Sequence, residues 1–226
     1  MTHNPIIIAL DVETANEARS LVSKIGSAVD FYKVGMELYA ASGMEVVTEL
    51  ITARKQVFLD LKFHDIGETV KRAVAQVAKR GVRFLTVHAT DSVMRAAVEG
   101  KGASELELLG VTVLTDVDQE DLSRMGHSCT LEELVGRRAK SAVELGMDGL
   151  VCSPLEVARV RMIAGPHTVL VTPGVRSAGA SVGDQKRVAT PAEALRNGAN
   201  YLVIGRQVTR AASPGAEVER ILKEIS

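Results

Sequence analysis

The segment VFLDLKFHDIGETV, residues 57–70, places charged side chains where a buried strand would be expected to stay apolar. It begins with the β-branched and aromatic residues typical of a strand, and Asp60, Lys62 and Asp65 follow at its end. Side chains alternate faces along a strand, so Asp60 and Lys62 should share one face. The apolar positions between them, continuing through Phe63, should face packed helices. The charged face is therefore expected to point into a site.

Two further charges are predicted at the ends of other strands. Asp11 follows the apolar run IIIAL, and Lys33 lies in FYKVG. With Asp60 and Lys62 they form a row that alternates in sign, and Asp65 lies just beyond it. A salt-bridge network is the alternative, but desolvation offsets much of the attraction in buried ion pairs. So many charges on adjacent strands favour a catalytic site.

The composition of this row restricts the chemistry of its lysines. A lysine among carboxylates stays protonated, because nearby negative charge favours its cationic form. It is then a poor nucleophile but a good general acid, and it can stabilise a developing carbanion. Schiff-base chemistry, which needs a neutral lysine, is disfavoured.

A second group of residues has the composition of an anion site. Gly205 would let backbone N–H groups approach an anion, and Arg206 adds a charged fork. Arg176 and Gln185 lie in VTPGVRSAGASVGDQKR, whose glycines and serines suit a mobile lid. For this segment alone an ordinary surface loop is an equal alternative. Together with Arg206 it favours a phosphate site.

These residues can lie close together only in a fold that brings the ends of several strands to one place. Short β-rich runs alternate with helical patterns, and strands are predicted at 6–10, 31–35, 56–63, 83–89, 108–115, 149–153, 168–174 and 201–205. Eight such units predict an α/β fold, a single (βα)8 TIM barrel over residues 1–226, with its chemistry at the carboxyl ends of the strands. The alternative, a doubly wound open sheet, is weakened because no glycine-rich dinucleotide fingerprint follows the first strand.

Local signals agree with these units. Gly81, Gly146 and Gly198 each fit the left-handed position that follows a helix. Ser213 and Pro214 fit the cap and the first position of a last helix.

Composition excludes several classes of function. The chain has 226 residues, 46% of them hydrophobic, and a formal net charge of -1. The charges are mixed along the chain, which argues against a nucleic-acid or membrane-surface partner. No run is long enough to span a membrane, and no signal peptide begins the chain, so a cytoplasmic location is expected. Cys129 and Cys152 form no CxxC pair, so neither a zinc site nor a disulfide framework is expected.

Eight motifs occur in an order that is typical of one family: ALD (9–11), KVG (33–35), DLKFHDI (60–66), GVTVLT (110–115), VCS (151–153), VTPGVR (171–176), GDQKR (183–187) and YLVIGR (201–206). On these motifs the chain resembles the orotidine 5′-monophosphate decarboxylase family. The resemblance covers nearly the whole chain. DLKFHDI is highly specific among barrels, whereas IGR alone would be weak.

The resemblance implies cofactor-free, metal-free decarboxylation of orotidine 5′-monophosphate (OMP) to UMP and carbon dioxide, the last step of UMP synthesis. Lys62 would protonate ring carbon six, within a catalytic group that also includes Asp60, Lys33 and Asp65. A homodimer is implied, with Asp65 and Thr69 entering the neighbouring site. The implied substrate contacts are Asp11, Lys33, Asp60, Thr69, Thr115, Ser153, Pro173, Arg176, Gln185, Gly205 and Arg206.

The sequence departs from the family pattern at one place and leaves two other functions open. The family usually continues DIPNTV, whereas this chain has Gly67 and Glu68, next to Asp65. A metal-dependent sugar-phosphate lyase or synthase would share a D-x-K-x-x-D strand, but it needs an acidic metal ligand where this chain has Lys33. A barrel that binds nucleotides without turning them over is the other alternative.

Overall fold

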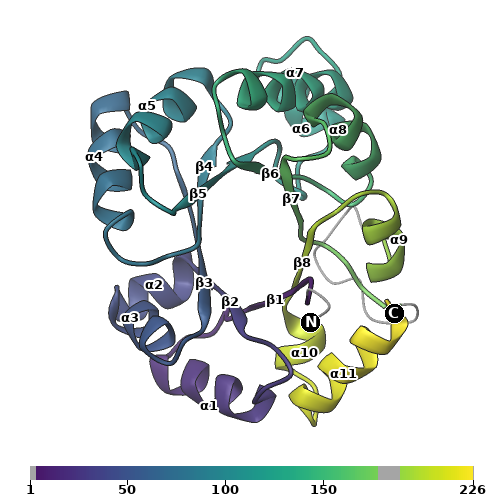
Figure 1. Cartoon of the computed structure of the whole chain (residues 1–226). Helices are drawn as coiled ribbons and strands as arrows, with labels where there is room; N and C mark the ends of the chain where they lie inside the picture. The colour runs from purple at the N-terminus through teal and green to yellow at the C-terminus, as the bar shows by residue number, and fades with distance from the viewer. Residues whose placement is uncertain (1–3, 178–188, 226) are drawn as a thin grey trace.

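Eight parallel strands close into a barrel in chain order, and the helices surround it (Figure 1). This computed structural model describes residues 4–177 and 189–225. The closed barrel confirms the TIM-barrel prediction and excludes the open sheet. The strands are β1 Ile6–Ala9, β2 Phe31–Gly35, β3 Gln56–Phe63, β4 Phe84–His88, β5 Glu107–Val111, β6 Gly149–Val151, β7 Val169–Thr172 and β8 Tyr201–Ile204.

The predicted strand bounds are accurate for β2 and β3 and too long for β5. The prediction runs to Thr115, but β5 ends at Val111. Thr112 still donates its N–H to the carbonyl of Val151, and a turn then forms, in which the N–H of Val117 donates to the carbonyl of Leu114. The chain therefore leaves the sheet at the rim of the barrel. There its residues line a cavity instead of pairing with a neighbouring strand.

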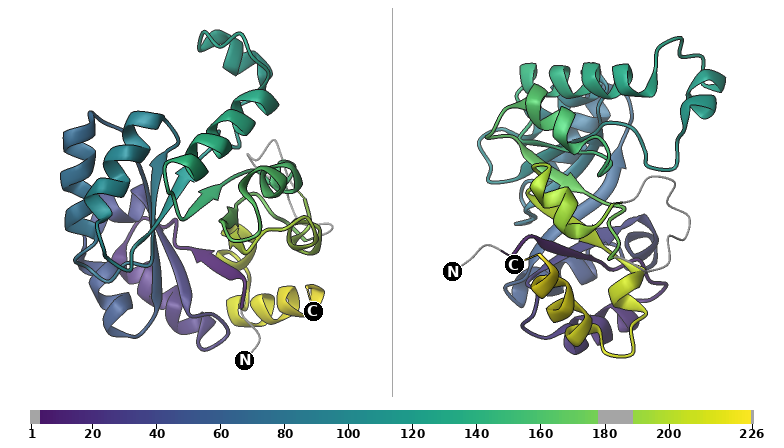
Figure 2. Two further views of the ribbon diagram at one scale, coloured as in Figure 1. Left: turned by 45° about the horizontal axis from the view of Figure 1, so that its top comes forward. Right: turned by 90° about the vertical axis from the view of Figure 1, so that its right-hand side faces the viewer.

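The helices are α1 Ala15–Ile25, α2 Met36–Ser42, α3 Glu45–Thr52, α4 Gly67–Val77, α5 Asp91–Lys101, α6 Gln119–Arg124, α7 Leu131–Glu144, α8 Val157–Ala164, α9 Pro191–Arg196, α10 Arg206–Thr209 and α11 Pro214–Glu224. Gly81, Gly146 and Gly198 all have positive φ, as predicted. Ser213 is the cap position of α11, although its side chain makes no capping bond. Figure 2 shows α6 and the start of α7 projecting away from the barrel.

Arg83 closes the amino-terminal end of the barrel. Its guanidinium carbon lies 5.3 Å from the ring centroid of Phe31, 5.0 Å from that of Phe84 and 5.3 Å from that of Tyr201. It also donates to the Tyr201 hydroxyl at 2.7 Å and pairs with Glu107 at 3.2 Å. Cation–π contact and hydrogen bonding fill this end of the barrel. Because the amino-terminal end of the barrel is occupied in this way, a ligand would bind at the carboxyl end of the strands.

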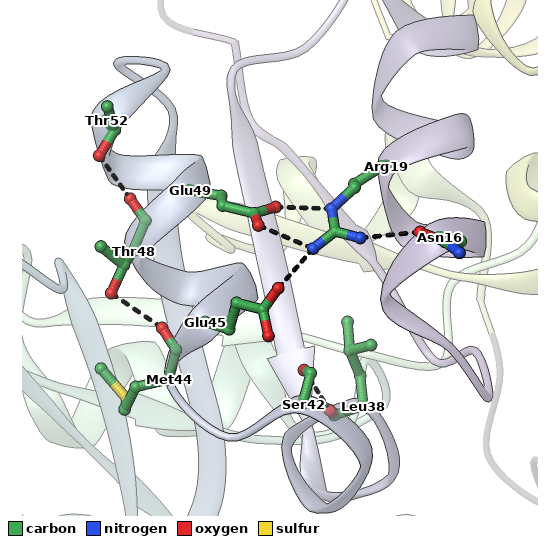
Figure 3. A network of polar contacts seen from close by, with 9 residues as sticks. All are labelled: Asn16, Arg19, Leu38, Ser42, Met44, Glu45, Thr48, Glu49 and Thr52. Carbon is green, nitrogen blue, oxygen red and sulfur yellow. Dashed lines mark hydrogen bonds and ion pairs between the residues drawn. The ribbon is translucent and has the colours of Figure 1, made fainter.

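An exposed network fastens α1 to α3 on the outside of the barrel (Figure 3). The Arg19 guanidinium lies 2.7 Å from a carboxylate oxygen of Glu45 and 2.7 Å from one of Glu49, and it donates to Asn16 at 2.8 Å. Exposed pairs of this kind contribute little stability, about 0–1 kcal/mol each. The network holds α1 against α3. Two residues of α1, Glu17 and Lys24, line the cavity described below.

Two predictions about the whole chain can be compared with the structure. Cys129 and Cys152 are free thiols, half-buried and buried respectively. Within residues 4–177 and 189–225, no helix is both long and apolar enough to cross a bilayer.

Candidate active site

A cavity of about 890 Å³ opens at the carboxyl ends of the strands. It is the place where a TIM barrel carries its chemistry. Nine residues predicted for the site line it: Asp11, Lys33, Asp60, Lys62, Thr115, Pro173, Arg176, Gly205 and Arg206.

The end of β3 is irregular, and this irregularity sets the position of Lys62. Between Leu59 and Phe63, β3 advances by four residues, while β4 advances by two, from Leu85 to Val87. Within this bulge Lys62 has φ 49°, in the left-handed region that non-glycine residues rarely adopt. The backbone of β3 is therefore irregular beyond Leu59, yet Asp60 and Lys62 both line the cavity and Phe63 packs against the apolar core, as predicted. Backbone strain of this kind is common at functional sites.

The predicted charged row is present and connected. Lys62 Nζ lies 2.9 Å from both Oδ1 and Oδ2 of Asp60. Lys33 Nζ lies 3.5 Å from Asp60 Oδ2 and 2.8 Å from Asp11 Oδ1. The side chain of Lys33 is 9% exposed and that of Asp60 is 13% exposed, whereas that of Asp11 is 55% exposed. The row therefore runs from the solvent side at Asp11 to the interior at Asp60.

The charges around Lys33 and Asp60 keep these two groups ionised. Burial lowers the pKa of Lys33, but the charges of Asp60 and Asp11 outweigh burial and raise it above the ordinary lysine value. Burial likewise raises the pKa of Asp60, and the charges of Lys33 and Lys62 outweigh it and bring that pKa below the ordinary value. A buried carboxylate between two ammonium groups is the result at neutral pH.

Two arginines also line the cavity. Arg176 follows β7 and is half-buried, and Arg206 begins α10 directly after Gly205. Burial, and after it the charge of Arg206, lower the pKa of Arg176 from its ordinary value. Two guanidinium groups that repel each other in one cavity form a site that an anion would stabilise.

The comparisons with known proteins agree with this geometry. A profile of the orotidine 5′-phosphate decarboxylase / HUMPS family matches residues 4–221. The chain belongs to this family. It is 49% identical over 221 residues to the orotidine 5′-phosphate decarboxylase of Rhodopseudomonas palustris strain HaA2, covering 98% of this chain and 94% of the relative. It is 50% identical over 221 residues to that of Bradyrhizobium sp. strain ORS 278, covering 98% and 91%.

A solved structure supports the same assignment. The crystal structure of orotidine 5′-phosphate decarboxylase from Lactobacillus acidophilus superposes with a TM-score of 0.87 at 36% identity. The match covers 99% of this chain and 100% of that one. The predicted family and the predicted fold are both confirmed.

Other family-motif residues lie away from the cavity lining. Asp65 is exposed, and its Oδ1 accepts a hydrogen bond from the N–H of Ile66 at 2.6 Å. Thr69 lies in the first turn of α4, which begins at Gly67. Ser153 is fully buried and is not among the lining residues, although its sequence neighbour Cys152 is. Gln185 lies outside the described residues.

Gly35 belongs to the family motif KVG, and the structure explains why a glycine suits this position. A Cβ on Gly35 would lie 2.8 Å from Asp11 Oδ1 and 3.0 Å from Lys33 Nζ. Any larger residue would therefore disturb the ion pair between these two side chains.

Thr86 is a site residue that the sequence analysis missed. Its hydroxyl donates to Asp60 Oδ1 at 2.9 Å, and it is fully buried in β4. Its signal in the sequence is a polar residue within the otherwise apolar run FLTV, on a strand next to the charged one. That signal becomes specific only when the neighbour of Thr86 across the sheet is known.

The metal-dependent alternative can be compared with the residues at the cavity. In the described part of the chain, no three His, Cys, Asp or Glu side chains converge as a metal site. Lys33 lies within β2, and its ammonium would face any cation bound near Asp60. The donors present suit an anionic substrate better than a metal ion.

Proposed function

We propose that this chain decarboxylates OMP to UMP and carbon dioxide, the last step of de novo UMP synthesis. The observation that carries the proposal is the Lys62 ammonium, 2.9 Å from both oxygens of a largely buried Asp60, facing a cavity that also contains Arg176 and Arg206. The names of the relatives support this choice of substrate. The cytoplasmic location stays a prediction.

The cavity suggests how the nucleotide lies. Its phosphate would bind Arg176, Arg206 and the backbone at Gly205. The ribose would then contact Asp11 and Lys33, and the pyrimidine would reach Lys62. Binding energy gained at the phosphate, remote from the reacting carbon, would hold the ring in the reactive position.

The chemistry follows from charge. The bond between ring carbon six and the carboxylate breaks, and its electron pair stays on carbon six as a carbanion without an effective resonance outlet. The Lys62 ammonium would stabilise this charge and transfer a proton to the carbon. The neutral amine would regain a proton from water. Asp60 would hold the ammonium in place and lie beside the substrate carboxylate, disfavouring the bound ground state.

We further propose a homodimer with shared sites. Asp65 is exposed between β3 and α4, and its neighbour Ile66 is 73% exposed. Met36, which follows β2 at the same end of the barrel, is 59% exposed. Apolar side chains so exposed at one rim suit burial by a partner chain. In this arrangement Asp65 and Thr69 would reach the neighbouring site.

The activity is tested by following the ultraviolet absorbance of OMP with purified protein in the presence of a strong chelator. We expect complete conversion to UMP. Conversion that stops with chelator would favour the metal-dependent alternative. OMP that remains intact while UMP binds would favour a nucleotide-binding barrel.

Replacing Arg206 by alanine is expected to raise KM for OMP about 10- to 100-fold. A hydrogen bond to a charged group contributes about 1.5–3 kcal/mol, and about 1.4 kcal/mol corresponds to a factor of ten. Steady-state kinetics check this, with Arg80→Ala as the control, because Arg80 is an exposed arginine that follows α4 at the other end of the barrel. An unchanged KM would place the phosphate elsewhere.

Mixing two inactive variants tests the shared sites. Lys62→Ala and Asp65→Ala chains, unfolded and refolded together in equal amounts, should regain about one quarter of wild-type activity, because half the dimers are mixed and each has one intact site. The control mixture of Lys62→Ala with Asp60→Ala should stay inactive, since both residues belong to the same barrel. No recovery in the first mixture, or recovery in the control, would contradict sharing.

A further inference from the structure

Thr86 connects the two residues on which the proposed chemistry depends. It is fully buried within β4. Its Oγ1 donates to Asp60 Oδ1 at 2.9 Å and accepts from the backbone N–H of Lys62 at 3.0 Å. A hydroxyl has one proton to donate and lone pairs to accept with, and Thr86 uses both functions.

Comparison with other buried threonines shows what is specific to Thr86. Thr112, also fully buried, donates to the backbone carbonyl of Val151 at 3.1 Å. Thr172 is fully buried at the end of β7, and its hydroxyl has no hydrogen-bond partner within the described ranges. A buried threonine in this barrel therefore need not contact a charged group. The contacts of Thr86 reflect its position beside the β3 bulge.

The bulge explains why the Thr86 hydroxyl is needed there. The pairing of β3 with β4 jumps from Leu59–Leu85 to Phe63–Val87. The N–H of Lys62 lies inside this jump, at the residue with φ 49°, and it bonds to a side chain on β4. The Thr86 hydroxyl thus supplies the partner for a buried N–H that a regular ladder would have satisfied.

We infer that Thr86 is a positioning residue for the decarboxylation, an inference that rests on the proposed function. It stabilises the left-handed backbone of Lys62 and at the same time fixes the rotation of the Asp60 carboxylate. Both Asp60 oxygens then face the Lys62 ammonium at 2.9 Å. One hydroxyl therefore sets the position of the proton donor and of its counter-ion.

The test replaces the hydroxyl while keeping the shape. Thr86→Val removes both hydrogen bonds at nearly constant volume, and kcat for OMP is expected to fall about 10- to 100-fold, the range for losing a hydrogen bond to a charged group. The Kd for UMP should change less than about threefold, since Thr86 is not among the cavity-lining residues. Thr86→Ser, which keeps the hydroxyl, should restore most of kcat.

A matched control separates positioning from general packing. Thr112→Val removes a hydroxyl of equal burial that bonds only a backbone carbonyl among its described contacts, and its kcat should stay near the wild-type value. A Thr86→Val chain with wild-type kcat, or equal losses in Thr86→Val and Thr86→Ser, would overturn the inference. If Thr86→Val does not fold, kcat is measured for Thr86→Ala instead. A Thr86→Ala chain with wild-type kcat would then overturn the inference.

A second measurement needs no turnover. The groups that face the Asp60 carboxylate are Lys33 from β2, Lys62 from β3 and Thr86 from β4, with Asp11 beyond Lys33. The Thr86 hydrogen bond contributes to the lowered pKa of Asp60, after burial and the two lysine charges. NMR titration of the Asp60 carboxyl should therefore show a higher pKa in Thr86→Val and no such rise in Thr112→Val.

The two measurements separate the inference from the proposed function. Wild-type protein that neither binds UMP nor consumes OMP would contradict the proposed function alone. An Asp60 pKa that is the same in wild-type and Thr86→Val protein would contradict the inference whether or not the wild-type chain is active.

Discussion

Replacing Lys62 by alanine is expected to slow OMP turnover by a factor on the order of 10⁴ or more while UMP still binds. A positioned general acid contributes about 10²–10⁴, and charge stabilisation in a water-poor site contributes about 10²–10³. Lys62 would supply both, so their combined loss is severe. Single-turnover kinetics with excess protein and calorimetric binding of UMP check the two parts.

The structure predicts that the Lys62→Ala chain folds. Alanine has the same Cβ as lysine, so the left-handed backbone costs no more than before. Asp60 also keeps Lys33 at 3.5 Å as a partner. Lys71→Ala removes an exposed lysine that pairs with Glu99 at 3.0 Å, and it serves as the control with wild-type turnover. A Lys62→Ala rate within tenfold of wild type would refute the acid role.

Replacing Lys62 by arginine separates the two contributions. Arginine keeps a positive charge but does not release its proton in proteins. If proton donation dominates, Lys62→Arg should be nearly as slow as Lys62→Ala. A substantial rate in Lys62→Arg would instead assign most of the effect to charge.

Replacing Asp60 by asparagine is expected to lower the free energy of unfolding by about 3–5 kcal/mol at neutral pH. Removing one partner from a buried charge network leaves the other charges uncompensated, and the cost is of this size. Here the Lys33 and Lys62 ammonium groups would face each other without the carboxylate that separates them. Urea denaturation of wild-type and Asp60→Asn protein measures the difference.

The pH dependence of this difference follows from the direction of the two pKa shifts. The folded pKa of Asp60 is lowered, so its contribution is complete above the unfolded value of about 3.9 and is lost as pH falls through the folded value. The folded pKa of Lys33 is raised, so its contribution is complete below about 10.4 and is lost as pH rises through the folded value. The difference between the two proteins should therefore shrink as pH falls through the folded pKa of Asp60, where the wild-type carboxylate becomes protonated. A difference that stays unchanged down to the lowest pH at which both proteins fold would contradict the charged-row account.

The charged row could be predicted from sequence because its position follows from local rules. Asp11, Lys33 and Asp60 each follow apolar residues in the later part of a strand or just after it, and parallel strands in a barrel bring these parts to one rim. The position of Gly205 and Arg206 at the cavity was predictable for the same reason, since both follow the last strand directly.

The backbone of Lys62 could not be predicted, because it depends on long-range pairing. Whether β3 bulges is set by its register with β4, and sequence alternation contains no information on that register. The role of Thr86 depends on the same pairing. Of the residues implied only by family resemblance, Thr115 and Pro173 line the cavity, whereas Ser153 is buried and is not among the lining residues.

The role of the Lys62 ammonium, held by Asp60, in decarboxylating OMP is the step on which the proposed function depends. It is tested most directly with OMP that has a carbon isotope label in its carboxylate, mixed with excess wild-type or Lys62→Ala protein and chelator, and followed by NMR. We predict that the labelled signal moves fully to carbon dioxide and bicarbonate with wild-type protein, and stays on bound OMP with Lys62→Ala. Label that stays on OMP with wild-type protein, or that is released equally fast by the variant, would contradict the account.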